Sequence, residues 1–113
     1  MIDNYTSLIY GWKLTGDKMD KFEEAMEEIS EDWFDDAQNV VTKDHMCGKY
    51  IYFGAILAHY DSNEENELII DDKLIKKSTK SYNDFIKKNP NIDKIFSKYA
   101  KGKPQLYLLQ NIW

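Results

Sequence analysis

The stretch YIYFGAILAHY, residues 50–60, decides the predicted fold because it is long, apolar and rich in strand-forming residues. Its eleven residues fall well short of the roughly 20 that a membrane-spanning helix needs. With Lys49 it predicts one long strand over residues 49–60. A short strand is expected before it at residues 39–44, and the intervening turn at residues 45–48 makes the pair a predicted hairpin.

The two faces of this long strand predict different surroundings, because successive side chains point to opposite sides of a sheet. One face should pack against helices and carries Ile51, Phe53, Ala55 and Leu57. The other face carries Tyr50, Tyr52, Ile56, Ala58 and Tyr60. Tyrosine rings on a helix-free face usually lie against another surface. We therefore expect a dimer, partner or ligand contact on that face, formed by Trp12, Tyr50, Tyr52 and Tyr60.

The other elements extend the prediction outward from this hairpin. Apolar residues at helical spacing predict a helix over residues 17–36, with a core-facing stripe of Met19, Phe22, Met26, Ile29 and Trp33. Further strands are expected at residues 6–14 and 105–113, and further helices at residues 73–88 and 91–99. The order β-α-β-β-α-(α)-β is typical of the ferredoxin-like fold. We predict one α+β domain over residues 1–113, with helices on one face of a four-stranded antiparallel sheet whose first and third strands are central.

Charge is distributed unevenly along the chain, and all 15 basic residues are lysines. Residues 17–36 contain ten acidic side chains and two lysines, whereas residues 73–103 contain ten lysines and two aspartates. Arginine is the side chain best suited to bidentate contacts with phosphate and guanine. Its absence and the net charge of −5 argue against direct nucleic-acid binding and phosphoryl transfer. An RNA-binding domain of the RRM type, which stacks bases on aromatic strands, stays an alternative for the tyrosine face.

The acidic helix predicted over residues 17–36 has three interpretations. Its like-charged i,i+4 neighbours, such as Glu24 and Glu28, repel each other by about 0.2–0.5 kcal/mol per pair. The helix is a solvated surface, a docking face for a basic partner protein, or a contact for the lysine-rich helix of the same or a second chain. The residues expected to dock are Asp20, Glu23, Glu24, Glu27, Glu28, Glu31, Asp32, Asp35 and Asp36.

No motif predicts catalysis, a cofactor or a metal site. His45 and Cys47 have the residue types of a base and a thiol, or of a zinc site completed by His59, but a hairpin turn with an ordinary thiol is the preferred interpretation. Residues 61–72 begin with the calcium-loop spacing D-x-N-x-E, yet Asn66 and Asp72 replace the required glycine and glutamate. We therefore expect a solvated loop and a non-enzymatic protein.

The expected compartment is the cytoplasm. The single cysteine, Cys47, cannot form a disulfide within the chain, which suits a reducing environment. The first residues, MIDNYTSLIYGWK, lack the basic and long apolar regions of a secretion signal. We therefore expect a soluble protein that does not enter a membrane.

The composition of the whole chain resembles that of small accessory proteins encoded by phages of AT-rich bacteria. The shared features are the absence of arginine, the abundance of Lys, Ile, Asn and Tyr, the small size and the acidic segment at residues 17–36. This resemblance includes anti-CRISPR and other anti-defence proteins, and implies inhibition of a host nucleic-acid-binding or defence protein. The expected partner is a basic protein surface, and a homodimer is expected as well. The alternative is a dimeric small-molecule or nucleotide-binding module that uses the tyrosine face.

Overall fold

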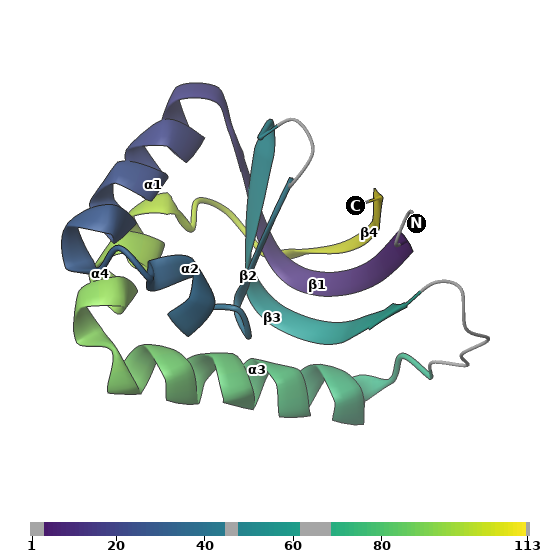
Figure 1. Cartoon of the computed structure of the whole chain (residues 1–113). Helices are drawn as coiled ribbons and strands as arrows, with labels where there is room; N and C mark the ends of the chain where they lie inside the picture. The colour runs from purple at the N-terminus through teal and green to yellow at the C-terminus, as the bar shows by residue number, and fades with distance from the viewer. Residues whose placement is uncertain (1–3, 45–47, 62–68, 113) are drawn as a thin grey trace.

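The computed structural model describes residues 4–44, 48–61 and 69–112 of the chain (Figure 1). Its strands and helices follow the order that the sequence predicts, with one additional short helix. The elements are β1 Asn4–Thr15, α1 Gly16–Ile29, α2 Trp33–Asp36, β2 Val41–Lys43, β3 Tyr50–Asp61, α3 Asp72–Lys88, α4 Pro90–Tyr99 and β4 Gln105–Ile112. Among these residues, no helix is both long and apolar enough to cross a membrane.

The sheet is antiparallel throughout, with strand order β2-β3-β1-β4. The predicted α+β class with a four-stranded antiparallel sheet is therefore confirmed, and β1 and β3 are the central strands as expected. The sheet is strongly bent, and the helices lie on the outer side of the bend (Figure 1). Helices α1, α2 and α4 lie beside one half of the sheet, and α3 runs beneath the other half.

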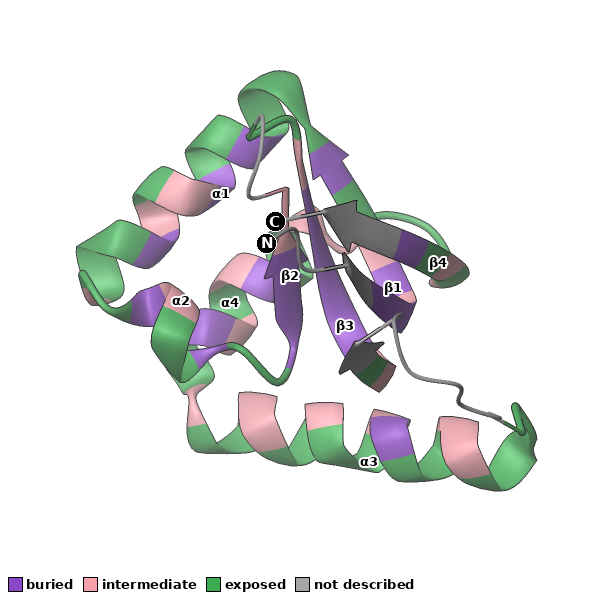
Figure 2. Ribbon diagram, turned by 45° about the vertical axis from the view of Figure 1, so that its right-hand side comes forward, coloured by how far each residue is buried: buried purple, intermediate pink, exposed green. Residues whose placement is uncertain are grey.

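The core between the sheet and the helices is built around aromatic rings. Phe22 of α1, Phe53 of β3 and Phe96 of α4 are fully buried, and their ring centroids lie 5.0–5.7 Å apart. Phe22 stacks on both of the other rings, and such aromatic pairs add stability beyond the area that they bury. This cluster fixes α1 and α4 on the sheet, and Figure 2 shows the buried residues of both helices turned toward the strands.

Strand β3 confirms the predicted helix-facing set and corrects one member of the opposite set. Ile51, Phe53, Ala55 and Leu57 are all buried in clusters on the helix side. Ala58 packs there as well, contrary to the prediction. The reason is a β-bulge: the register pairs Ile56 with Ile9 and Ala58 with Leu8, which leaves Leu57 without an opposite residue.

The predicted single helix over residues 17–36 is interrupted. Helix α1 ends at Ile29, Ser30 is extended with φ −163° and ψ 139°, and the chain resumes as the four-residue α2. The predicted core position of Ile29 is wrong, since this side chain is 40% exposed. Trp33 is buried as predicted, and the change of direction at Ser30 allows its ring to pack edge-on against Phe22, with centroids 6.1 Å apart.

Candidate functional site

The predicted docking residues form one acidic surface on α1, α2 and the segment between them. One side of α1 is buried through Met19, Phe22 and Met26, so the charged residues on the other sides of this helix face solvent. Eight of the nine carboxylates are exposed and Glu23 is half-buried. We call this set the acidic surface: Asp20, Glu23, Glu24, Glu27, Glu28, Glu31, Asp32, Asp35 and Asp36.

The acidic surface has almost no compensation from its own chain. Within the described residues, no ion pair involves any of its nine carboxylates, and Asp35 alone accepts a side-chain hydrogen bond, from Gln38 Nε2 at 3.3 Å. The last turn of α1 contains Glu27 and Glu28 and no basic residue. Negative charge at a helix C-terminus is unfavourable because the helix dipole is negative there. Glu27 and Glu28 therefore lower the stability of α1, and no basic residue in that turn offsets this cost.

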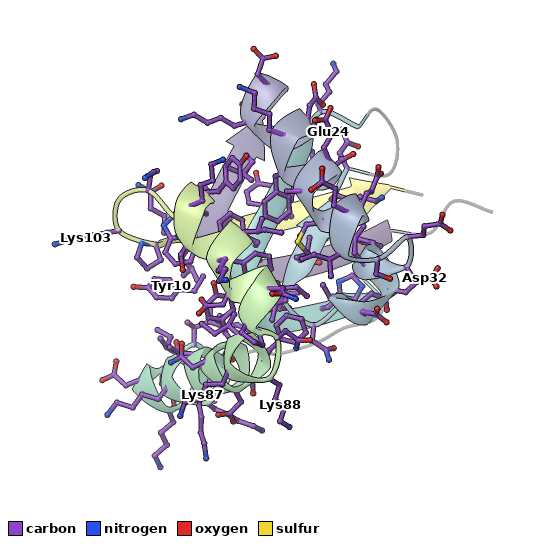
Figure 3. All side chains as sticks on the ribbon, turned by 90° about the vertical axis from the view of Figure 1, so that its left-hand side faces the viewer. Tyr10, Glu24, Asp32, Lys87, Lys88 and Lys103 are labelled. Carbon is purple, nitrogen blue, oxygen red and sulfur yellow. The ribbon has the colours of Figure 1, made fainter. Side chains whose placement is uncertain are left out.

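Apart from Lys18 and Lys21 of α1, the lysines lie in other parts of the chain. Six exposed lysines cover the outer face of α3: Lys73, Lys76, Lys77, Lys80, Lys87 and Lys88. In Figure 3 the side chains of Lys87 and Lys88 point away from those of Glu24 and Asp32, and Lys103 lies at a third corner of the molecule. No ion pair joins α1 to α3 among the described residues, so the interpretation of the acidic helix as an intramolecular contact for α3 gains no support.

The tyrosine face exists, but its central ring is already covered. Tyr50 and Tyr52 lie together on the inner side of the bend, with ring centroids 5.2 Å apart, and Tyr107 of β4 lies 4.9 Å from Tyr52. Tyr52 is only 5% exposed. The ammonium group of Lys13 lies 5.6 Å from the Tyr52 ring centroid. The chain itself thus covers Tyr52, one of the rings on which a ligand or partner was expected to lie.

The structure contradicts the placement of Trp12 on this face. Trp12 is the register partner of Phe53, so both side chains lie on the helix side, where their ring centroids are 5.3 Å apart. Its indole Nε1 donates a hydrogen bond to the carbonyl oxygen of Gly102 at 3.1 Å. Tyr60 pairs with Thr6 in the strand register, and its side chain lies outside the described residues.

The residues weighed for covalent or metal chemistry are largely not described. His45, Cys47 and most of the calcium-like segment, residues 62–68, lie outside the described residues. His59 is described, and its Nδ1 lies 2.6 Å from the hydroxyl of the buried Ser7. Among the described residues no group of three or more His, Cys, Asp or Glu side chains is placed to hold a metal ion.

One ionisable group in the core departs from its ordinary behaviour. Burial, aided by the negative charge of Asp93, raises the pKa of Tyr82 to about 12. The Tyr82 ring lies parallel to Phe96, with centroids 6.1 Å apart, and contacts Trp12. Its hydroxyl is therefore neutral at physiological pH, and we assign it a role in packing α3 against the sheet rather than in acid–base chemistry.

Sequence reasoning missed a cavity of about 880 Å³ between the α2–β2 connection, β3 and α3. It is lined by Phe34, residues 38–42, Ile56 and His59 of β3, and Ser81, Asp84, Phe85 and Lys88 of α3. The one available signal was the mismatch in length between the two strands of the predicted hairpin. A short strand beside a long strand leaves part of the long strand without a neighbour on that side.

Comparison of the chain with protein-family models, with curated proteins and with solved structures found no match.

Proposed function

We propose that the protein is a non-enzymatic binding protein that docks onto a basic protein surface through its acidic surface. The observation that carries the proposal is the set of nine clustered carboxylates, eight of them exposed, without an ion pair in the described chain. Such a cluster gains favourable energy when a complementary positive surface approaches, and it raises the rate of association at low salt. We further propose that the partner is a host nucleic-acid-binding or defence protein and that docking occurs in the cytoplasm.

The spacing of charge on α1 supports imitation of a nucleic-acid strand. A helix of 14 residues is about 21 Å long. Helix α1 carries six carboxylates, counting Asp17, or about one for every 3.5 Å. A nucleic-acid strand carries one phosphate for about every 3.4 Å of its axis. Lys18 and Lys21 offset the first two turns, so the match is best from Glu23 onward. A groove lined with lysine or arginine for phosphate would meet a comparable density of charge.

The test is a pull-down from bacterial lysate with matched charge variants. The first variant changes Glu24, Glu27, Glu28 and Glu31 to lysine. The control reverses four charges on α3 by changing Lys73, Lys76, Lys77 and Lys80 to glutamate. We expect the wild type and the control to capture a basic protein at low salt, the first variant to lose it, and a DNA duplex to compete with capture. Capture that resists high salt, or that survives the first variant, would contradict the proposal.

The tyrosine face gives weaker support to the two alternative functions. A nucleotide-binding module or an RRM-like domain needs exposed rings on the central strands, on which a base can stack. Tyr52 is buried and Trp12 faces the helices, so Tyr50 and Tyr107, both half-buried, are the accessible rings among the described side chains of this face. A thermal-shift panel of nucleotides and metabolites tests these alternatives, since a ligand at about 100 times its dissociation constant adds about 2.7 kcal/mol of stability.

We also propose that the architecture is a variant of the ferredoxin-like fold. Read from its other edge, the sheet has the strand order β4-β1-β3-β2. Helix α1 lies between β1 and β2 in the chain, and β3 is inserted between these two strands in the sheet. This arrangement supports the proposal. Helices α2 and α4 are additions to that plan.

The expected homodimer stays a proposal, and β4 is the surface that supports it best. This strand is at the edge of the sheet and carries no charged residue. Leu106 and Leu108 are 46% and 68% exposed. An uncharged strand edge is self-complementary. When it pairs antiparallel with the same strand of a second copy, no charged side chain of one copy has to meet an opposite charge on the other. The other edge, β2, is only three residues long.

A further inference from the structure

The cavity beside α3 has the size and lining of a binding site. Its volume of about 880 Å³ lies within the range of about 300–1,000 Å³ that ligand sites occupy. Apolar side chains from three elements line it, including Phe34, Val41 and Phe85. Figures 1 and 2 show the surrounding elements: α2 and β2 on one side, β3 behind them and α3 below.

Strand β3 borders the cavity with the edge of its backbone rather than with a face of the sheet. Strand β2 pairs only with Ile51, Tyr52 and Phe53, and on the side toward Asp61 a hydrogen bond joins the amide of Gly54 to the carbonyl oxygen of Val40 at 2.8 Å. Strand β3 continues to Asp61, and no described strand flanks this part of it on the side of β2. The outer edge of β3 beyond Gly54 therefore borders the cavity instead of another strand.

The N–H and C=O groups of β3 are directed toward the cavity at the residues that line it. Each residue of an antiparallel strand directs its N–H and C=O to one side, and the sides alternate along the strand. The amide of Gly54 is directed toward β2, so the backbone groups of Ile56 are directed to the same side. The bulge at Leu57 then shifts the alternation by one residue and brings His59 to that side. Ile56 and His59 are the two β3 residues that line the cavity.

We propose that this cavity binds an extended peptide segment of a partner protein, which adds to the outer edge of β3 as a fifth strand. A strand edge is recognised best by another extended backbone, whose groups alternate with the same period. Alternate side chains of the peptide would enter the apolar part of the cavity beside Phe34 and Phe85. The described lining contains one carboxylate, Asp84, and one ammonium group, Lys88, so its charges balance. This balance favours an uncharged apolar segment over a phosphate-bearing ligand.

This inference goes beyond the proposed docking through the acidic surface, because none of the nine carboxylates lines the cavity. The two sites can therefore be tested separately. The charge-reversed variant of α1 should keep its peptide binding, and filling the cavity should leave salt-dependent capture by the acidic surface unchanged.

The experiment is selection from a library of random heptapeptides against the wild-type protein, followed by binding measurements on two variants. Ser81→Trp fills the cavity from α3, and Lys80→Trp places the same side chain on a neighbouring exposed position that does not line it. We expect enriched peptides with alternating apolar residues, at least about tenfold weaker binding to Ser81→Trp, and unchanged binding to Lys80→Trp. Thermal unfolding verifies that both variants fold. Failure to enrich any peptide, or equal binding to both variants, would overturn the proposal.

A second measurement distinguishes strand addition from a pocket that binds side chains alone. An enriched peptide is resynthesised with N-methyl groups on either alternate set of residues. Strand addition requires that one of these peptides loses binding and the other keeps it, and that amide exchange of Ile56 slows in the complex. Peptides that bind equally well after both modifications, or unchanged amide exchange of Ile56 in the complex, would exclude the fifth strand.

Discussion

Gly11 and Gly54 are directly opposed in the register of β1 and β3, and neither position has room for a side chain. A Cβ at Gly11 would overlap the carbonyl oxygen of Phe53, and one at Gly54 would lie 2.5 Å from the carbonyl oxygen of Tyr10. Gly54 also has φ +145°, which L-residues with a side chain rarely adopt. The glycine pair thus allows the two central strands to approach each other closely.

The first prediction concerns this glycine pair. Gly54→Ala should lower the free energy of unfolding by about 3 kcal/mol or more, because the methyl group meets rigid backbone and the dihedral is strained. Gly102→Ala is the matched control: it also has positive φ, +79°, but its Cβ would meet no atom within 4 Å, so we expect a loss of about 1–2 kcal/mol. Urea unfolding measures both. Similar losses for the two variants would show that close approach at Gly54 is unimportant.

Much of this fold could be predicted from local patterns, and the errors have identifiable physical causes. Helical spacing placed Met19, Phe22 and Met26 in the core, and the order of the elements along the chain, which is typical of the ferredoxin-like fold, placed the first and third strands at the centre of the sheet. The break at Ser30 was missed because Trp33 continues the helical spacing, so an interrupted and an uninterrupted helix have the same pattern. Trp12 was assigned to the wrong face because both faces of β1 are apolar near it, through Leu8 and Ile9.

The candidate sites also include features that local patterns predict and features that they do not. The exposure of the acidic surface could be predicted, since one side of α1 is apolar and the rest must face solvent. The burial of Tyr52 could not, because it depends on Tyr107, which lies far away in the sequence and is brought beside it by the pairing of β4 with β1. The cavity beside Phe85 depends on where α3 crosses β3, and no local pattern contains that information.

The second prediction tests the cost of the acidic surface. Glu28→Lys should raise the free energy of unfolding by about 0.5–1.5 kcal/mol at low ionic strength, because it removes repulsion with Glu24 and places a positive charge at the negative end of the α1 dipole. Glu31→Lys lies in the break after α1, so it should raise the free energy of unfolding much less than Glu28→Lys does. Thermal or urea unfolding at low salt and at about 1 M salt measures both, and the gain should nearly vanish at the higher salt. A gain that persists there, or a loss of stability, would contradict an electrostatic origin.

The third prediction follows from the raised pKa of Tyr82. In the folded protein this pKa is about 12, whereas a tyrosine in an unfolded chain has its ordinary pKa of 10.0. Below pH 10 both states keep the proton, so the group leaves stability unchanged. Between pH 10 and 12 the unfolded chain releases the proton while the folded protein retains it, and stability should therefore decrease as pH rises through this window.

Tyrosinate absorbance provides the measurement. The titration curve of the folded wild type minus that of Tyr82→Phe should show one group with a midpoint near 12. Stability of Tyr82→Phe should also decrease less steeply between pH 10 and 12 than that of the wild type. A difference curve with its midpoint near 10 would show that Tyr82 is not buried between α3 and the sheet.

The fourth prediction concerns association through β4. Leu108→Lys places a charge on the exposed edge strand, where antiparallel pairing of two copies would bring the two new ammonium groups close together, so it should shift a dimer to monomers. Ile69→Lys is a matched control, because Ile69 is 69% exposed, much like Leu108 at 68%, and lies outside the sheet. Both variants should keep the unfolding free energy of the monomer, since neither side chain is buried. Light scattering over a range of concentrations measures the mass. A wild type that stays monomeric throughout, or equal effects of the two variants, would exclude a dimer through β4.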